Sequence, residues 1–324
     1  MAQIDFILTG YEHGGTTLLS ELFRANGFES GFEVGVLLGE RPSDLRQNTD
    51  FWNLLLPGWN ISEQIREQAV SGDFQDFYDT ICEASFPDHS GAFFDKTPRY
   101  MSALGQCMSR GPFIAKAVVI HRDPRAVFLS QARKLEPDLH VIAAVEKRFD
   151  MLRELYVHYF IGSVAHLTNP RVLFVPFEEL VSREDTWLKN IGNFATGEPF
   201  VKRRGNSRFD NVTSSGMDPG KVVEFDRLLP VALQRRILDG TRLAAPFFAG
   251  PVERAQYGDL WQETITAARA RLAAFGLPAT GTSVNGTYFE PLTYLIRYPD
   301  VLKTGADPVE HFRRHGRREG RIPA

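Results

Sequence analysis

The distribution of apolar residues along the chain predicts short buried strands that alternate with amphipathic helices. Apolar runs of strand length, each followed by turn residues or a helical pattern, occur at 4–9, 92–95, 113–121 and 171–176. Helical periodicity occurs at 16–25, 61–69, 74–85, 124–134, 142–166 and 183–194, and again near 224 and at 260–275. This alternation predicts an α/β fold with a central parallel sheet flanked by helices.

Two polar segments interrupt the pattern. Residues 202–221 are polar and glycine-rich, which predicts a long loop or lid. Residues 276–286 are small and turn-rich and indicate a boundary. We therefore predict a main domain over residues 1–280 and a small helical appendage over residues 287–324, too short to form a large core alone.

Composition and charge narrow the class of protein. The 324 residues, 43% hydrophobic and 24% charged, suffice for one large α/β core. A net charge of −3 argues against a whole-chain nucleic-acid binder. The first residues lack the basic region of a signal peptide, and no segment reaches the length of a transmembrane helix. The spacing of the two cysteines matches neither a zinc site nor a disulfide framework. We expect a cytoplasmic protein without a membrane span, and the oligomeric state stays open.

The first strand leads into a glycine-rich turn and a helix, "FILTGYEHGGTTLL", which is the layout of a phosphate-binding loop. The lysine of the nucleoside-triphosphate motif is missing, because Thr16 stands in its place. The backbone N–H groups of Gly14, Gly15, Thr16 and Thr17 would still attract an oxyanion at the helix N-terminus. By itself the turn is equally compatible with a tight strand-to-helix connection.

A second motif, "VVIHRDPRAVFLS", ends the third predicted strand and begins a helix. Asp123 is the predicted N-cap and Pro124 the first helical residue. Arg122 at the strand end, with Ser130 eight residues further on, would bind a second and separate phosphate.

Together the two motifs resemble the sulfotransferases that use 3′-phosphoadenosine 5′-phosphosulfate as donor, similar to the carbohydrate and tyrosylprotein enzymes and their bacterial relatives. The resemblance implies a phosphate-loop-like fold without a metal, in which residues 14–17 hold the 5′-phosphosulfate, and Arg122 and Ser130 hold the 3′-phosphate. The product would be adenosine 3′,5′-bisphosphate. The segment "RVLFVPFEELVSREDTWLKNIGNF" is also similar to the family, so the resemblance extends to about residue 206.

Two further residues carry the chemistry that this resemblance implies. Glu33 is similar to the glutamate that acts as general base, and its apolar neighbours would favour partial desolvation. Lys96 in "FFDKTPRYM" is similar to the lysine that approaches the transferring sulfuryl group. The alternatives are a solvated loop carboxylate for Glu33 and a surface ion pair between Asp95 and Lys96.

The main departure from the family is His13, which occupies the position of a usual lysine or arginine. We expect it to contact the bridging or 5′-phosphate oxygens. In the polar loop, Arg204 and Gly205 resemble a basic segment that closes over the 3′-phosphate, although a solvated basic loop is as good an interpretation.

The function predicted from the sequence is sulfuryl transfer to an acceptor hydroxyl. The C-terminal residues resemble a module of bacterial proteins that handle cell-surface glycans, which favours a saccharide acceptor. A tyrosine, a lipid or a small metabolite fits the same catalytic residues. A phosphate-loop kinase and a nonenzymatic nucleotide- or glycan-binding protein are the alternatives from other classes.

Overall fold

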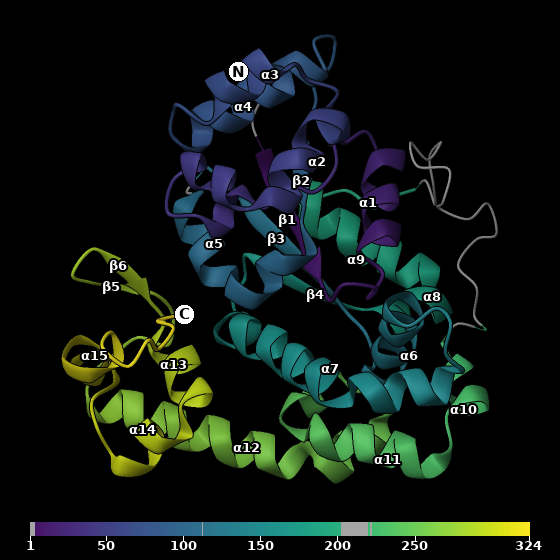
Figure 1. Ribbon diagram of the computed structural model, residues 1–324, viewed down its shortest axis with the longest axis vertical. Helices are drawn as coiled ribbons and strands as arrows, with labels where there is room; N and C mark the ends of the chain where they lie inside the picture. Colours follow the sequence, from purple (N-terminus) through teal and green to yellow (C-terminus); the bar gives the residue numbers. More distant parts are fainter. Residues whose placement is uncertain (1–3, 112, 202–219, 221) are drawn as a thin grey trace. The chain divides into compact units, whose positions relative to one another are not determined.

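The predicted strands pair into one parallel sheet in the computed structural model of the chain, which describes residues 4–111, 113–201, 220 and 222–324. The strands are β1 (Ile4–Gly10), β2 (Phe93–Lys96), β3 (Lys116–His121) and β4 (Val172–Pro176), in the order β2-β1-β3-β4. Figure 1 shows β1 in the middle, with β2 and β3 as its neighbours. The expected parallel α/β fold is confirmed.

The described residues divide into two compact units, and the first contains the sheet. This unit comprises the described residues within 1–100, 110–122 and 170–223. Its helices are α1 (Thr16–Ala25), α2 (Thr49–Trp59), α3 (Glu63–Ala69), α4 (Phe74–Ser85), α8 (Phe177–Ser182) and α9 (Glu184–Thr196), with 3₁₀ turns at Val36–Leu38 and Pro42–Gln47.

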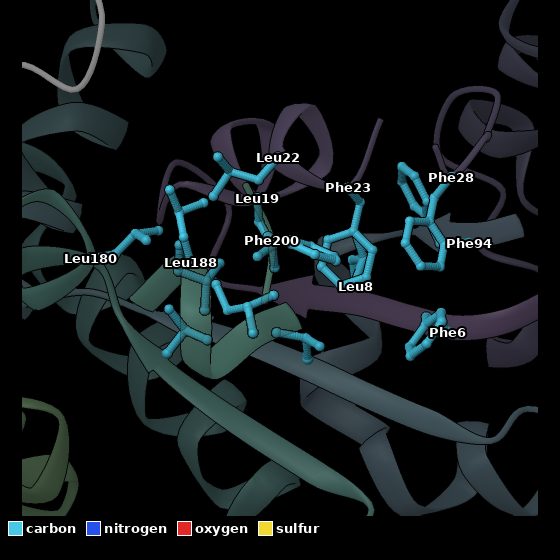
Figure 2. Packing of buried hydrophobic residues seen from close by; sticks show 14 of the residues in the cluster. Phe6, Leu8, Leu19, Leu22, Phe23, Phe28, Phe94, Leu180, Leu188 and Phe200 are labelled. Atoms are coloured by element: carbon cyan, nitrogen blue, oxygen red, sulfur yellow. The ribbon is translucent and has the colours of Figure 1, made fainter. Parts of the chain in front are cut away.

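One face of the sheet is covered by α1, α8 and α9. Figure 2 shows Leu19, Leu22 and Phe23 of α1 directed towards the sheet, where Leu8 of β1 belongs to the same cluster. Phe23 also makes edge contacts with four neighbouring phenylalanine rings, at centroid distances of 5.2–5.8 Å. Ile7, the residue between the two core positions of β1, is equally inaccessible, as expected of a central strand buried on both faces.

The sequence analysis did not predict the helix α2. Its interior contains Pro57 followed by Gly58, two residues that disfavour a helix. The helix nevertheless forms because Asn48 accepts a hydrogen bond from the N–H of Phe51 at its start, and because Phe51, Leu55 and Trp59 bury one face. Packing therefore outweighs local propensity here.

The second unit is mainly helical and comprises residues 101–109, 123–169 and 224–324. Its helices are α6 (Pro124–Leu135), α7 (Val141–Ser163), α10 (Glu224–Leu228), α11 (Val231–Gly240), α12 (Pro251–Ala274), α13 (Pro291–Arg297), α14 (Pro299–Thr304) and α15 (Pro308–His311); α5 (Leu104–Arg110) ends in the first unit. The domain boundary near residue 280 stays a prediction.

The C-terminal segment contains the expected helices and also an antiparallel hairpin that was not expected. The strands β5 (Thr282–Val284) and β6 (Thr287–Phe289) are joined by Asn285 and Gly286, whose φ angles are 51° and 76°. An Asn-Gly pair with two positive φ angles is the preferred two-residue hairpin turn. Part of the predicted linker is therefore regular structure, and the sequence "SVNGTYF" contains the pattern of a hairpin.

Candidate functional site

The loop between β1 and α1 has the geometry of an anion-binding turn. The N–H of Gly14 donates to the carbonyl of Tyr11 at 2.8 Å, and His13 and Gly15 have φ angles of 64° and 105°. A Cβ atom at Gly15 would lie 2.6 Å from the Phe177 ring, so this position requires glycine. The first N–H groups of an α-helix have no carbonyl partner within the helix, so the start of α1 presents donors to a ligand.

Arg122 supports this loop from the neighbouring strand. It follows β3, which pairs with β1 up to Gly10, so both strands end at the same edge of the sheet. Its Nη1 donates to the His13 carbonyl at 3.1 Å, and its guanidinium lies 4.4 Å from the centroid of the Phe177 ring. A cation that is 8% exposed therefore lies against the loop. This arrangement fits an anionic ligand.

Glu12, the other charged residue of the loop, forms an ion pair with Arg99, with Oε1 and Nε 3.0 Å apart. Its negative charge is thus partly compensated beside the anion-binding turn. The side chain is partly exposed, so the pair makes only a small contribution to stability.

The structure brings together the two residues to which the sequence assigned the chemistry. Lys96 ends β2, which pairs with β1, and its Nζ lies 2.7 Å from Oε1 of Glu33. The Lys96 side chain is 6% exposed and that of Glu33 is 23% exposed. The ammonium also lies 4.9 Å from the centroid of the Phe32 ring. The contact joins positions 63 residues apart in the sequence.

Asp95 contradicts the alternative of a surface ion pair with Lys96. Its side chain is fully buried and accepts hydrogen bonds from the hydroxyls of Tyr78, Tyr100 and Thr97 at 2.6, 2.7 and 2.8 Å. Burial raises the pKa of Asp95, and these hydrogen bonds oppose the shift. Burial and the Asp95 charge likewise raise the pKa of Tyr78 well above its ordinary value.

The residues 33–39 form a segment, here called the strap, that this network holds in place. The Thr97 hydroxyl accepts hydrogen bonds from the N–H groups of Val34 and Gly35 at 3.1 and 3.3 Å. Further along the strap, the N–H of Leu37 donates to the Tyr100 hydroxyl at 3.4 Å. Arg110 Nη1 donates to the carbonyls of Leu37 and Leu38 at 3.0 and 3.1 Å. Glu33 is therefore carried by a backbone segment anchored at several points.

The sequence analysis did not predict this supporting network. The aspartate inside the apolar strand "FFDK" could have indicated it, because a buried carboxylate requires hydrogen-bond donors. The tyrosine donors, Tyr78 on α4 and Tyr100 after β2, were not identifiable from local patterns, because only the fold brings α4 to this strand.

The remaining predicted donor-binding residues stay predictions. Ser130 lies on α6 and belongs to the second unit, whereas Arg122 belongs to the first. Arg204 and Gly205 lie outside the described residues. Among the residues that are described, no group of three or more His, Cys, Asp or Glu side chains is arranged to hold a metal ion.

The described helices include none that combines the length and the apolar character needed to cross a membrane. Both cysteines, Cys82 and Cys107, are buried as free thiols, and burial raises the pKa of Cys82. The Cys82 thiol is therefore not poised as a nucleophile.

Comparison with known proteins defines the class of protein that this fold and loop represent. The model of the sulfotransferase family matches residues 5–200, so the chain belongs to the sulfotransferase family. Sulfotransferases of this family depend on 3′-phosphoadenosine 5′-phosphosulfate. This family membership replaces the two alternative hypotheses, a phosphate-loop kinase and a nonenzymatic binding protein.

A solved structure shares the fold at low sequence identity. The chain resembles the sulfotransferase domain of the Synechococcus PCC 7002 olefin synthase, with 20% identity, a TM-score of 0.53, and coverage of 74% of this chain and 92% of that domain. The sulfotransferase domain of the curacin biosynthetic pathway has 15% identity and a TM-score of 0.48, with coverage of 74% of this chain and 97% of that domain. The sequence matches no curated protein.

Proposed function

We propose that the protein transfers a sulfuryl group from 3′-phosphoadenosine 5′-phosphosulfate to a hydroxyl group of a saccharide, with Glu33 as the general base. The contact of 2.7 Å between Glu33 and Lys96 carries this proposal. It lies at the end of β2, and β2 pairs with the strand that leads into the anion-binding loop. Strand ends in open parallel sheets are where ligands bind.

In the proposed reaction, Glu33 accepts the proton of the acceptor hydroxyl while the hydroxyl oxygen bonds to sulfur. The bond between sulfur and the bridging oxygen breaks, and its electron pair remains on the 5′-phosphate of adenosine 3′,5′-bisphosphate. Lys96, His13 and the loop N–H groups stabilise the negative charge that develops on that oxygen. Glu33 thus acts on the acceptor hydroxyl, and Lys96 acts on the leaving oxygen of the donor.

The donor binds, in this proposal, to residues that both motifs supply. Gly14, Gly15, Thr16 and Thr17 hold the 5′-phosphosulfate, supported by the left-handed turn at Gly15 and by Arg122 behind the loop. Ser130, Arg204 and Gly205, together with Arg122, bind the 3′-phosphate, as the resemblance of the motifs implies. These groups orient the donor without entering the chemistry.

We also place the reaction in a reducing compartment, the cytoplasm. Two free cysteines that are buried and without a disulfide support this assignment. The saccharide acceptor is supported by the resemblance of the C-terminal residues to a glycan-handling module.

The experiment is a transfer assay with donor labelled in its sulfuryl group, against a panel of hydroxyl compounds. We expect Glu33→Gln to lower kcat by about 10²–10⁴-fold, because the amide cannot accept the proton. Adenosine 3′,5′-bisphosphate should raise the melting temperature of Glu33→Gln as much as that of the wild type, since the substitution leaves the donor loop intact.

Glu63→Gln provides the control, because this glutamate is exposed at the start of α3 and takes no part in the proposed chemistry. Its kcat should equal that of the wild type. An unchanged kcat in Glu33→Gln would refute the role of Glu33 as general base. A wild-type protein that neither binds the bisphosphate nor transfers sulfate would refute the proposed function.

A further inference from the structure

A cavity of about 670 Å³ lies beside the strap. Its size is in the range of small-molecule binding sites. The wall is formed by the strap, the following 3₁₀ turn and the start of α2.

The cavity begins close to the proposed base. Gly35 is in the wall and lies two residues after Glu33, and two residues of extended chain span at most about 7 Å. Glu33 itself is not among the lining residues, so the cavity wall and the proposed base are neighbours along the strap.

The same anchors fix the base and the cavity wall relative to each other. Thr97 binds the N–H of Gly35, a wall residue, and the N–H of Val34, the residue after Glu33. Val36, another wall residue, is 2% exposed, so the strap cannot move without opening the core. The backbone that carries Glu33 and the backbone of the cavity wall are thus held by the same anchors.

The lining of the cavity is polar and acidic. It carries the carboxylates of Glu40, Asp44 and Asp50 and the amides of Gln47 and Asn48, and no lysine or arginine occurs among the described residues that line it. Burial alone would raise the pKa of Asp44, but hydrogen bonds from Arg41 and from the N–H of Glu40 outweigh it and hold the pKa below its ordinary value.

The two arginines of this segment are already paired. Arg41 Nε lies 3.2 Å from Oδ1 of Asp44, and Arg46 Nη2 lies 2.6 Å from Oε2 of Glu67. Arg110, whose Nη1 donates to the carbonyl of the wall residue Leu38, adds one positive charge. With Asp44 compensated by Arg41, Glu40 and Asp50 still exceed it by one negative charge, which disfavours anions and attracts cations.

We propose that this cavity is the acceptor subsite and that it selects neutral or amine-bearing polyhydroxylated acceptors over acidic ones. Carboxylate and amide oxygens accept hydrogen bonds from hydroxyl and ammonium groups, whereas an acidic acceptor meets like charge. The inference rests on the proposed function, because it names the substrate class of the same site.

The test compares glucose, glucosamine and glucuronic acid, each as a methyl glycoside and as short oligomers, as acceptors of labelled sulfate. We expect kcat/KM for the glucose and glucosamine compounds to exceed that for the glucuronic acid compounds by about tenfold or more. In the double variant Glu40→Lys/Asp50→Lys the order should reverse through the acceptor KM, while the KM of the donor stays unchanged.

A second double variant, Glu63→Lys/Glu198→Lys, makes the same change of charge away from the cavity. Glu63 lies in the first turn of α3, as Asp50 lies in the first turn of α2, and Glu198 is exposed like Glu40. Its acceptor preference should equal that of the wild type, which separates the cavity from the net charge of the protein.

The possible outcomes distinguish a failure of the proposed subsite from a failure of the proposed function. Sulfate transfer with the same acceptor preference in both double variants would overturn the subsite and leave the proposed function standing. Donor binding without transfer to any neutral or amino sugar would also overturn the subsite. Absence of both donor binding and transfer would overturn the proposed function itself.

Discussion

At the scale of single residues, the hydroxyl of Thr97 positions Glu33, the proposed general base, without contacting it. It donates to the buried Asp95 and accepts from two N–H groups of the strap, so one oxygen links the strand end to the segment that carries Glu33. The lysine partner of Glu33 is the residue before Thr97, so the proposed base and the cation are both positioned from the end of β2.

We expect Thr97→Val to lower kcat by about 10²-fold, because small displacements of a catalytic group have effects of this size. The isosteric side chain leaves two buried N–H groups unpaired, which should also lower the free energy of unfolding by about 1–3 kcal/mol. Steady-state kinetics and urea unfolding measure the two effects.

Thr97→Ser and Tyr78→Phe provide the comparison that separates positioning from stability. Serine keeps the hydroxyl and should retain most of kcat. Tyr78→Phe removes one donor to Asp95 and should destabilise the protein, but it leaves the strap hydrogen bonds in place and should retain kcat. Equal losses of kcat in Thr97→Val and Tyr78→Phe would contradict a positioning role for Thr97.

The strap is the element on which both proposals depend, and its shape requires a glycine. Gly35 has a φ of 69°, and a Cβ atom there would lie 2.2 Å from the Phe51 ring of α2. The left-handed turn and the close approach of α2 therefore exclude any side chain at this position.

We expect Gly35→Ala to lower the free energy of unfolding through two costs, about 1 kcal/mol for the left-handed conformation and about 1–3 kcal/mol for the steric overlap. The substitution should also lower kcat and raise the acceptor KM, because the strap carries Glu33 and forms part of the cavity wall. Urea unfolding and transfer kinetics report these changes.

Gly197→Ala is the matched control for this element. Gly197 also has a positive φ, 83°, but nothing lies within 4 Å of the position of a Cβ atom. Only the conformational cost applies, so this variant should lose less stability and keep its activity. If both variants lost the same stability, the overlap with Phe51 would not constrain the strap.

At the scale of the whole molecule, the pH dependence of stability should reflect a partly buried histidine. Burial and the charge of Arg297 lower the pKa of His158 from 6.5 to about 4, and Arg297 Nη1 lies 3.2 Å from its Nδ1. As pH falls below 6.5, the unfolded chain protonates this ring while the folded chain keeps it neutral. The unfolded state then binds more protons, so the free energy of unfolding decreases towards pH 4.

We expect the melting temperature of the wild type to fall more steeply than that of His158→Gln between about pH 6.5 and pH 4.5, because glutamine keeps an acceptor for Arg297 without titrating. Thermal unfolding at several pH values gives the two slopes. His140→Gln serves as the control, since His140 is exposed at the start of the same helix. Identical slopes for wild type and His158→Gln would refute the contribution of His158.

The sequence by itself determined the parallel α/β fold, the helix limits at residues such as Thr16 and Pro124, and the loop that marks the sulfotransferase family. These features follow from local patterns, namely the periodicity of apolar residues, the capping residues and the glycines at short spacing. The sequence also named Glu33 and Lys96, through resemblance to that family.

Only the tertiary structure decided how those residues meet. Glu33 contacts Lys96, and Tyr78 and Tyr100 reach Asp95, because parallel pairing and helix packing bring distant segments together. The α2 helix and the cavity beside it were likewise set by packing that local propensity opposes at Pro57. Long-range contacts of this kind depend on the whole fold, which is why no local pattern in the sequence revealed them.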